Sequence, residues 1–200
     1  MPELALALWA LYFAASLGIR ALAHSRATGT SGLLLGRARP GSVKWLGETA
    51  QMLAIGLGVA AAALADTVEP IDALDGSGGH IAGLAIFALG FAGVVGSQHA
   101  MGASWRIGQD EEERTVLVTS GPFRIIRNPI FSSLVLVQLG LALLVPSVLA
   151  GAGLVLLIPS ILIQVRAVEE PHLIRTHGNE YLAYARRVGR FAPGLGRLGD

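Results

Sequence analysis

Five long runs of mainly apolar residues divide this chain, and they constrain its fold more than any other feature. A helix needs about 20 such residues to cross the hydrocarbon core of a bilayer. The runs cover residues 4–23, 45–65, 81–102, 129–145 and 147–165. They predict an all-α integral membrane helical bundle with five transmembrane helices and a C-terminal helical segment, as one membrane domain over residues 1–200.

The composition agrees with a membrane protein and excludes several kinds of chemistry. Only 14% of the residues are charged, whereas a soluble chain carries about 25%. The absence of cysteine excludes disulfides, thiolate catalysis and Cys-ligated zinc. Glu3 precedes the first run and Arg20 lies near its end, so we expect a retained anchor in place of a cleaved signal peptide.

The charged residues predict how the bundle is oriented. Lys and Arg gather in residues 20–44, 106–127 and 166–197, whereas residues 66–75 carry four acidic residues and no basic one. Cytoplasmic loops collect Lys and Arg, so we expect a multi-pass protein of the plasma or inner membrane, with its N-terminus outside and its C-terminus in the cytoplasm. The third run carries Gly90, Gly93 and Gly96, and this small-residue face should let a neighbouring helix approach closely.

Two polar segments should meet at the cytoplasmic face, because only Pro146 separates the fourth and fifth runs and the two should form a hairpin. In the first segment, Asn128 and Pro129 are typical of a helix start. Arg124 and Arg127 are spaced to share one side of the preceding turn. Together with the helix N-terminus they suit a carboxylate or phosphate, and anchoring to lipid headgroups explains them equally well.

The second polar segment carries Glu169 and Glu170 at the end of a hydrophobic run. Adjacent carboxylates are costly there unless they are solvated or paired. A ligand site and an ion-pair network with nearby arginines are equally open. His172 and His177 do not share a helical face, and the chain lacks the metalloprotease, P-loop, Rossmann and serine-hydrolase motifs. We therefore expect no metal and no nucleic-acid partner.

Several short motifs occur in a fixed order across residues 98–193. They are Met101-Gly102-x-Ser104-Trp105-Arg106-x-Gly108, Leu117-Val118-x-x-Gly121-Pro122-Phe123-Arg124-x-x-Arg127-Asn128-Pro129, Glu169-Glu170, Gly178-x-Glu180-Tyr181-x-x-Tyr184 and Arg190-Phe191-x-Pro193. This pattern resembles the isoprenylcysteine carboxyl methyltransferases and their phospholipid methyltransferase relatives. The resemblance covers about half of the chain and assigns it a methyltransferase-like, cofactor-binding portion.

The resemblance implies an enzyme that uses S-adenosylmethionine and releases S-adenosylhomocysteine, with the cofactor at the cytoplasmic ends of the last spans. The implied cofactor-binding residues are His99, Trp105, Arg106, Leu117, Val118, Gly121, Pro122, Arg124, Arg127, Asn128, Pro129, Glu169, Glu170, Tyr181 and Tyr184. Arg127, Asn128 and Glu170 are the implied catalytic residues. On this hypothesis Glu170→Gln and Arg127→Ala each abolish cofactor binding.

The substrate implied is a lipophilic small molecule that enters sideways from the bilayer, between spans that face the small-residue surface. Family members commonly carry Arg-His-Pro followed by x-Tyr, whereas this chain has Arg127-Asn128-Pro129-Ile130-Phe131. The difference favours an acceptor other than prenylcysteine. Two alternatives stand beside this function: a membrane NADPH-dependent reductase of the sterol-reductase type, and a non-catalytic bundle that binds membrane lipids.

Overall fold

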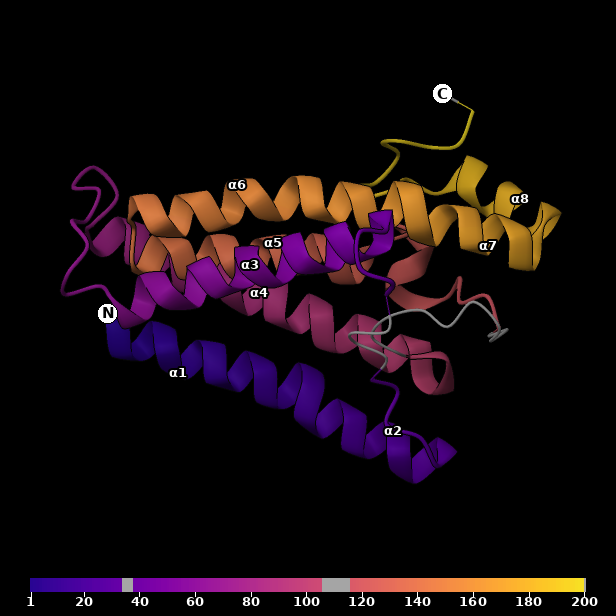
Figure 1. Ribbon diagram of the computed structural model, residues 1–200, viewed down its shortest axis with the longest axis horizontal. Helices are drawn as coiled ribbons and strands as arrows, with labels where there is room; N and C mark the ends of the chain where they lie inside the picture. Colours follow the sequence, from indigo (N-terminus) through magenta and orange to yellow (C-terminus); the bar gives the residue numbers. More distant parts are fainter. Residues whose placement is uncertain (34–37, 106–115, 200) are drawn as a thin grey trace.

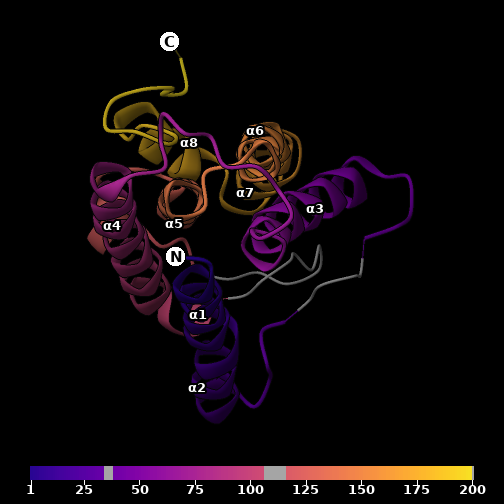
Figure 2. The ribbon, with the colours of Figure 1, turned by 90° about the vertical axis from the view of Figure 1, so that its left-hand side faces the viewer.

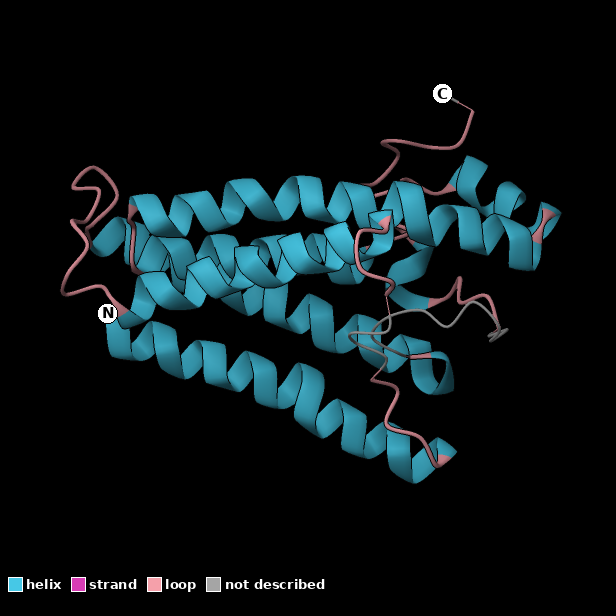
Figure 3. Ribbon diagram, in the orientation of Figure 1, coloured by secondary structure: helices cyan, strands magenta, loops and turns pink. Residues whose placement is uncertain are grey.

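The structure is a computed structural model that describes residues 1–33, 38–105 and 116–199. Long helices run side by side through it, and no strand occurs within the described residues (Figures 1 and 3). The first rod comprises α1 (Pro2–Phe13), the π-helical turn η1 (Ala14–Ile19) and α2 (Arg20–Thr28). It is followed by α3 (Val43–Ala63), α4 (Ser77–Met101) and the short 3-10 turns η2 (Gly102–Ser104) and η3 (Gly121–Arg124).

The C-terminal half forms a hairpin that ends in two short helices. Helix α5 (Pro129–Leu144) is joined through Pro146 to α6 (Val148–Ile163), which continues without a break through the π-helical turn η4 (Gln164–Glu169) into α7 (Glu170–His177). Gly178 has a φ of 52°, which favours glycine, and it separates α7 from α8 (Asn179–Arg187).

Four helices of the described chain are long and apolar enough to cross a membrane: Pro2–Thr28, Val43–Ala63, Ser77–Ser104 and Val148–His177. Helix α5 is apolar but has only 16 residues, which corresponds to about 24 Å at 1.5 Å per residue. A full crossing takes about 30 Å. The structure therefore supports four spans, and the fifth stays a prediction.

Helices α4 and α5 are packed through glycines on both sides. A Cβ atom added at Gly90 would lie 2.7 Å from the Val137 nitrogen, and one added at Gly140 would lie 2.5 Å from the Phe87 nitrogen. Gly96 has no atom within 4 Å of the same position, so it lies outside the contact. Because α5 lies against this surface, it leaves little room between α4 and α5 there, and the route by which a substrate enters stays a prediction.

The two ends of the bundle differ in charge. The turn after α3 and the turn at Pro146 lie together at one end, where the Ile71 nitrogen donates to the Pro146 carbonyl oxygen at 2.8 Å. That end carries the acidic segment of residues 66–75, whereas the described basic segments lie at the other end, with α2, η3, α7 and α8 (Figure 1). This separation agrees with the charge pattern from which the orientation was predicted.

Candidate functional site

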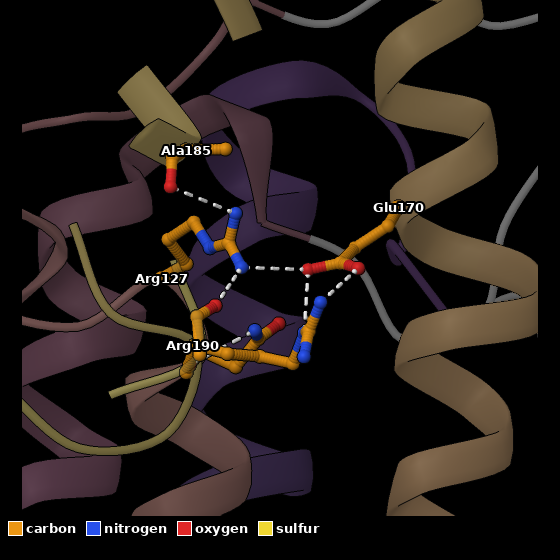
Figure 4. A network of polar contacts seen from close by, with 6 residues as sticks. Arg127, Glu170, Ala185 and Arg190 are labelled. Carbon is orange, nitrogen blue, oxygen red and sulfur yellow. Dashed lines mark hydrogen bonds and ion pairs between the residues drawn. The ribbon is translucent and has the colours of Figure 1, made fainter. Parts of the chain in front are cut away.

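Three charged side chains meet where α5, α7 and the C-terminal segment join (Figure 4). The Glu170 carboxylate lies 3.0 Å from Nη2 of Arg127, and Arg190 donates to its two oxygens at 2.8 and 2.9 Å. The Arg127 and Glu170 side chains are only 1% and 9% exposed. The hydrogen bonds to Glu170 raise the pKa of the Arg190 guanidinium. The arrangement is an ion-pair network with one carboxylate between two guanidinium groups.

Backbone hydrogen bonds hold the C-terminal segment against the start of α5. The Arg127 nitrogen donates to the Gly189 carbonyl at 2.8 Å, and the Asn128 nitrogen donates to the Arg190 carbonyl at 3.1 Å. The Asn128 side chain donates to that same Arg190 carbonyl and does not cap α5. Helix α5 begins where predicted, but the Asn128 side chain serves the C-terminal segment.

Arg127 is therefore almost fully engaged within the protein. Nη1 donates to the Ala185 carbonyl at 3.4 Å, and Nη2 donates to the Gly196 carbonyl at 2.9 Å in addition to its contact with Glu170. Only Nε is buried without a hydrogen-bond partner among the described residues. This guanidinium cannot offer its paired N–H groups to a second carboxylate.

A cavity of about 770 Å³ opens beside this network. One part of its wall is apolar and comes from the first rod and α3, with Phe13, Leu17, Met52, Ile55 and Val59. The other part is polar and comes from the start of α5, η4, α7 and α8, with Asn128, Glu169, His172, His177 and Tyr181. Both π-helical turns, η1 and η4, contribute to the wall, and such turns are frequent at functional sites.

Two tyrosines of α8 close the polar part of the cavity. The rings of Tyr181 and Tyr184 meet edge to face at 6.1 Å, and Tyr184 donates its hydroxyl proton to the Phe123 carbonyl at 2.7 Å. Burial raises the pKa of Tyr184 to about 12 and raises that of Tyr181 as well. Both phenols stay neutral at physiological pH, so they present aromatic surface and hydroxyl groups.

Trp105 forms the wall at the end of α4 and is only 1% exposed. The Arg20 guanidinium carbon lies 5.0 Å from the centre of its ring, and Arg20 also donates to the Gly102 carbonyl. The His24 ring lies 5.6 Å away on the same rod. Trp105 is thus a buried residue that ties the first rod to α4.

The structure brings most of the predicted site residues to this cavity. Those in its wall are Trp105, Leu117, Val118, Arg127, Asn128, Pro129, Glu169, Tyr181 and Tyr184. Those outside the wall are His99, Gly121, Pro122, Arg124 and Glu170. Arg106 lies outside the described residues. The roles of all these residues in binding or catalysis stay predictions.

The positions of His99 and Arg124 outside the wall follow from the local backbone geometry. His99 is exposed because Gln98 and Met101 occupy the face of α4 that lines the cavity. Arg124 is exposed, whereas Arg127 is buried, because the backbone turns between them at the end of η3. The expectation that they share one side of the turn is therefore wrong, and whether either of them binds an anion stays a prediction.

Sequence reasoning missed several polar residues of the wall. Ser16, Glu48, Gln51, Gln98 and Gln164 come from four different helical segments and face the same cavity. Each lies within an apolar run or at its end, where a polar side chain is costly. These unfavourably placed polar side chains were the signal in the sequence that could have identified the wall. Arg190 was noted only as part of a motif, and its place in the ion-pair network follows from the folded C-terminal segment.

Comparison with known proteins decides the family. The family model described as phospholipid methyltransferase matches residues 79–180, which is half of the chain. The chain belongs to the phospholipid methyltransferase family. No curated protein matches the chain significantly.

The match indicates that this family member is a membrane methyltransferase, which agrees with the function that the motifs implied. The matched residues run from α4 to the start of α8 and include Trp105, Arg127 and Glu169. The apolar wall from the first rod and α3 lies outside the match. The sterol-reductase alternative has no support from the comparison.

Proposed function

We propose that this phospholipid methyltransferase family member transfers a methyl group from S-adenosylmethionine to a lipophilic small molecule that enters from the bilayer. The observation that supports this most is the two-sided cavity. Family-matched residues such as Asn128, Glu169 and His172 contribute to its polar part, and its apolar part comes from the first rod and α3, which are long and apolar enough to span a membrane. A site of this kind suits a polar cofactor beside an apolar acceptor.

The residues of the polar part fit the cofactor. Glu169 is half-buried in the wall and can accept hydrogen bonds from ribose hydroxyls. The faces of Tyr181 and Tyr184 suit a sulfonium. The first turn of α5 leaves its N–H groups without intrahelical partners, and Ile130 and Phe131 of that turn line the cavity. These N–H groups suit the cofactor carboxylate better than Arg127, whose paired donors are engaged.

The bound cofactor supplies an electrophilic methyl group. The protein's own contribution is to hold the acceptor in line with that group and to exclude water. Trp105, Tyr181 and Tyr184 form the buried parts of the wall that serve this purpose.

The apolar part of the cavity provides a route from the lipid. Met52 and Gly56 belong to its wall and are exposed on α3, while Phe13 and Leu17 face them from the first rod. Figure 2 shows α1 and α3 on the side of the bundle away from α8. We infer that an acceptor enters between these two helices. The orientation that agrees with the charges places the cofactor site in the cytoplasm and the N-terminus outside.

Thermal stabilisation of the purified, detergent-solubilised protein tests this function. S-adenosylhomocysteine should raise Tm by an amount set by its concentration relative to Kd, and NADPH in parallel should not. Glu169→Gln should weaken the S-adenosylhomocysteine effect at least tenfold in ligand concentration. Glu180→Gln removes an exposed carboxylate of α8 outside the cavity wall and is the matched control.

Two outcomes contradict the proposal. One is a cooperative melt that S-adenosylhomocysteine leaves unchanged at high concentration, which favours a non-catalytic bundle. The other is stabilisation by NADPH alone, which favours a reductase.

A further inference from the structure

A second hollow lies between the two helices of the C-terminal hairpin. This groove has a volume of about 380 Å³ and is bounded by α5, α6 and Phe191 of the C-terminal segment. None of its described wall residues belongs to the first rod or α3, which form the apolar part of the cavity. Phe131 at the start of α5 lines both hollows. The start of α5 therefore separates the groove from the cavity.

The groove exists because the two helices of the hairpin pack on different partners. A Cβ atom added at Gly140 of α5 would lie 2.5 Å from a backbone nitrogen of α4. One added at Gly153 of α6 would lie 2.8 Å from a backbone oxygen of α3. Figure 2 shows the same arrangement, with α4 beside α5 and α3 beside α6. The groove lies away from the Pro146 turn, between the first turns of α5 and the last turns of α6.

The wall of the groove is hydrocarbon. Val135 of α5 and Leu162 of α6 face each other across it, and Ile158 is 48% exposed. Ser132 is the polar residue of the described wall, and its hydroxyl donates to the Phe191 carbonyl at 2.8 Å. An apolar hollow between membrane-spanning helices, with its hydroxyl engaged, suits an alkyl chain and not a polar molecule.

A positive charge lies just beyond the groove. Arg166 follows Leu162 by four residues on the continuous α6–η4 helix, so the two share one side of that helix. The Arg166 side chain is exposed and has no ion pair within the described segments. It lies toward the basic end of the bundle, where a spanning helix reaches the phosphates of the membrane surface.

The nearby carboxylates do not neutralise Arg166. Glu169 faces the cavity, and Glu170 is held by Arg127 and Arg190. Neither glutamate belongs to the wall of the groove. A basic pocket between membrane helices at the cytoplasmic side is typical of a site for an anionic lipid head group.

We propose that the groove holds one acyl chain of an anionic glycerophospholipid and that Arg166 binds the phosphate of this lipid. The lipid is a resident ligand that is not methylated, so the inference goes beyond the proposed function and does not depend on it. Its chain contacts Phe191, next to the arginine that binds Glu170. Occupancy of the groove therefore holds the C-terminal segment against α5 and stabilises the protein.

Stabilisation by defined lipids, without any cofactor, tests the site. The delipidated full chain in detergent is titrated with dioleoylphosphatidylglycerol, dioleoylphosphatidylcholine or inorganic phosphate, and Tm is measured. Phosphatidylglycerol should act at about fivefold lower concentration than phosphatidylcholine, which is the effect of one arginine on an anionic lipid. Inorganic phosphate, which lacks the chain, should leave Tm unchanged. Native mass spectrometry should retain one phosphatidylglycerol per chain.

Variants locate the lipid. Arg166→Gln should remove the preference for phosphatidylglycerol and leave binding of phosphatidylcholine as it is. Ile158→Trp should weaken both lipids, because the larger side chain fills the groove. Arg26→Gln removes an exposed arginine of α2 at the same end of the bundle and should keep the preference, which makes it the matched control.

Equal stabilisation by the two lipids overturns the proposal, and this comparison needs only the wild-type chain. Stabilisation by inorganic phosphate equal to that by phosphatidylglycerol also overturns it, because the acyl chain then contributes nothing. Loss of the preference in Arg26→Gln to the same extent as in Arg166→Gln assigns it to net charge and not to the groove. A dimer that Ile158→Trp dissociates shows that a second copy of the chain, and not a lipid, occupies the groove.

Discussion

The carboxylate of Glu170 lies 3.0 Å from the guanidinium of Arg127, and Arg190 binds the same carboxylate from the C-terminal segment. The contact joins Arg127, two residues before α5 begins, to the first residue of α7. Glu170 itself is not part of the cavity wall, whereas its neighbour Glu169 is. Of the two uses considered for the adjacent glutamates, the structure assigns the ion-pair network to Glu170 and leaves Glu169 to face the cavity.

Glu170→Gln should therefore lower stability more than it lowers cofactor affinity. Removing one partner of a buried ion pair leaves an uncompensated charge and costs about 3–5 kcal/mol. Urea or thermal unfolding in detergent measures this loss, and S-adenosylhomocysteine binding is measured on the folded fraction. Glu180→Gln should stay within about 0.5 kcal/mol of the wild type. Unchanged stability with binding abolished would instead support the hypothesis from the sequence that Glu170 holds the cofactor.

The candidate site was predictable in part because its residues lie at helix ends. Asn128-Pro129 marks the start of α5, and the hairpin at Pro146 brings the ends of the fourth and fifth runs together, so Arg127 and Glu169 were expected at one face. The tyrosines of α8 were implied only by the resemblance. The partner of each charge was not predictable. Arg190 reaches Glu170 only because backbone hydrogen bonds fold residues 189–196 back onto Arg127 and Asn128. Local sequence patterns do not encode such contacts.

Gly90→Ala should destabilise the protein, and Gly96→Ala should not. The new methyl at Gly90 would lie 2.7 to 2.9 Å from atoms of α5, two of them in its backbone, so the two helices must move apart. Overpacking of this kind costs about 1–3 kcal/mol. At Gly96 the methyl meets open space, and alanine is the better helix former by about 1 kcal/mol. Thermal unfolding of both variants checks the difference, and equal Tm values would contradict the close α4–α5 packing.

The positions of the helices were predictable because they depend on local runs of apolar residues. The contacts between helices were not, because they depend on how the helices pack. Apolar run length located the helices, and the starts of α3, α4, α5 and α6 lie within a few residues of expectation. The glycine pattern predicted a close neighbour for α4, yet Gly83 and Gly140 take part in that contact while Gly96 does not. The continuous rod from α6 into α7 was missed, because the charges at residues 166–170 resemble the end of a span.

Gly32→Ala should cost more stability than Gly29→Ala, although both positions have a positive φ, 69° and 80° respectively. The backbone strain is common to the two variants. Only at Gly32 would the new methyl lie 2.9 Å from the His24 ring and 3.0 Å from the Trp105 ring. Thermal unfolding, together with tryptophan fluorescence as a probe of Trp105, measures the difference. Equal losses would mean that the loop does not hold Trp105 in the cavity wall.

Tyr184 should make stability fall at alkaline pH. Its pKa is raised by burial from 10.0 to about 12, so the folded protein holds its proton more tightly than the unfolded chain does. The stabilisation is complete below pH 10 and is lost progressively as the pH rises to about 12. Tyr184→Phe removes both the titration and the hydrogen bond to the Phe123 carbonyl. The variant should start about 1 kcal/mol less stable near neutral pH and lose less stability above pH 10. Unfolding of the two proteins across this range, compared at each pH so that other titrating groups cancel, gives the test. Parallel pH profiles would show that the Tyr184 hydroxyl is solvated in the folded protein and does not close the cavity.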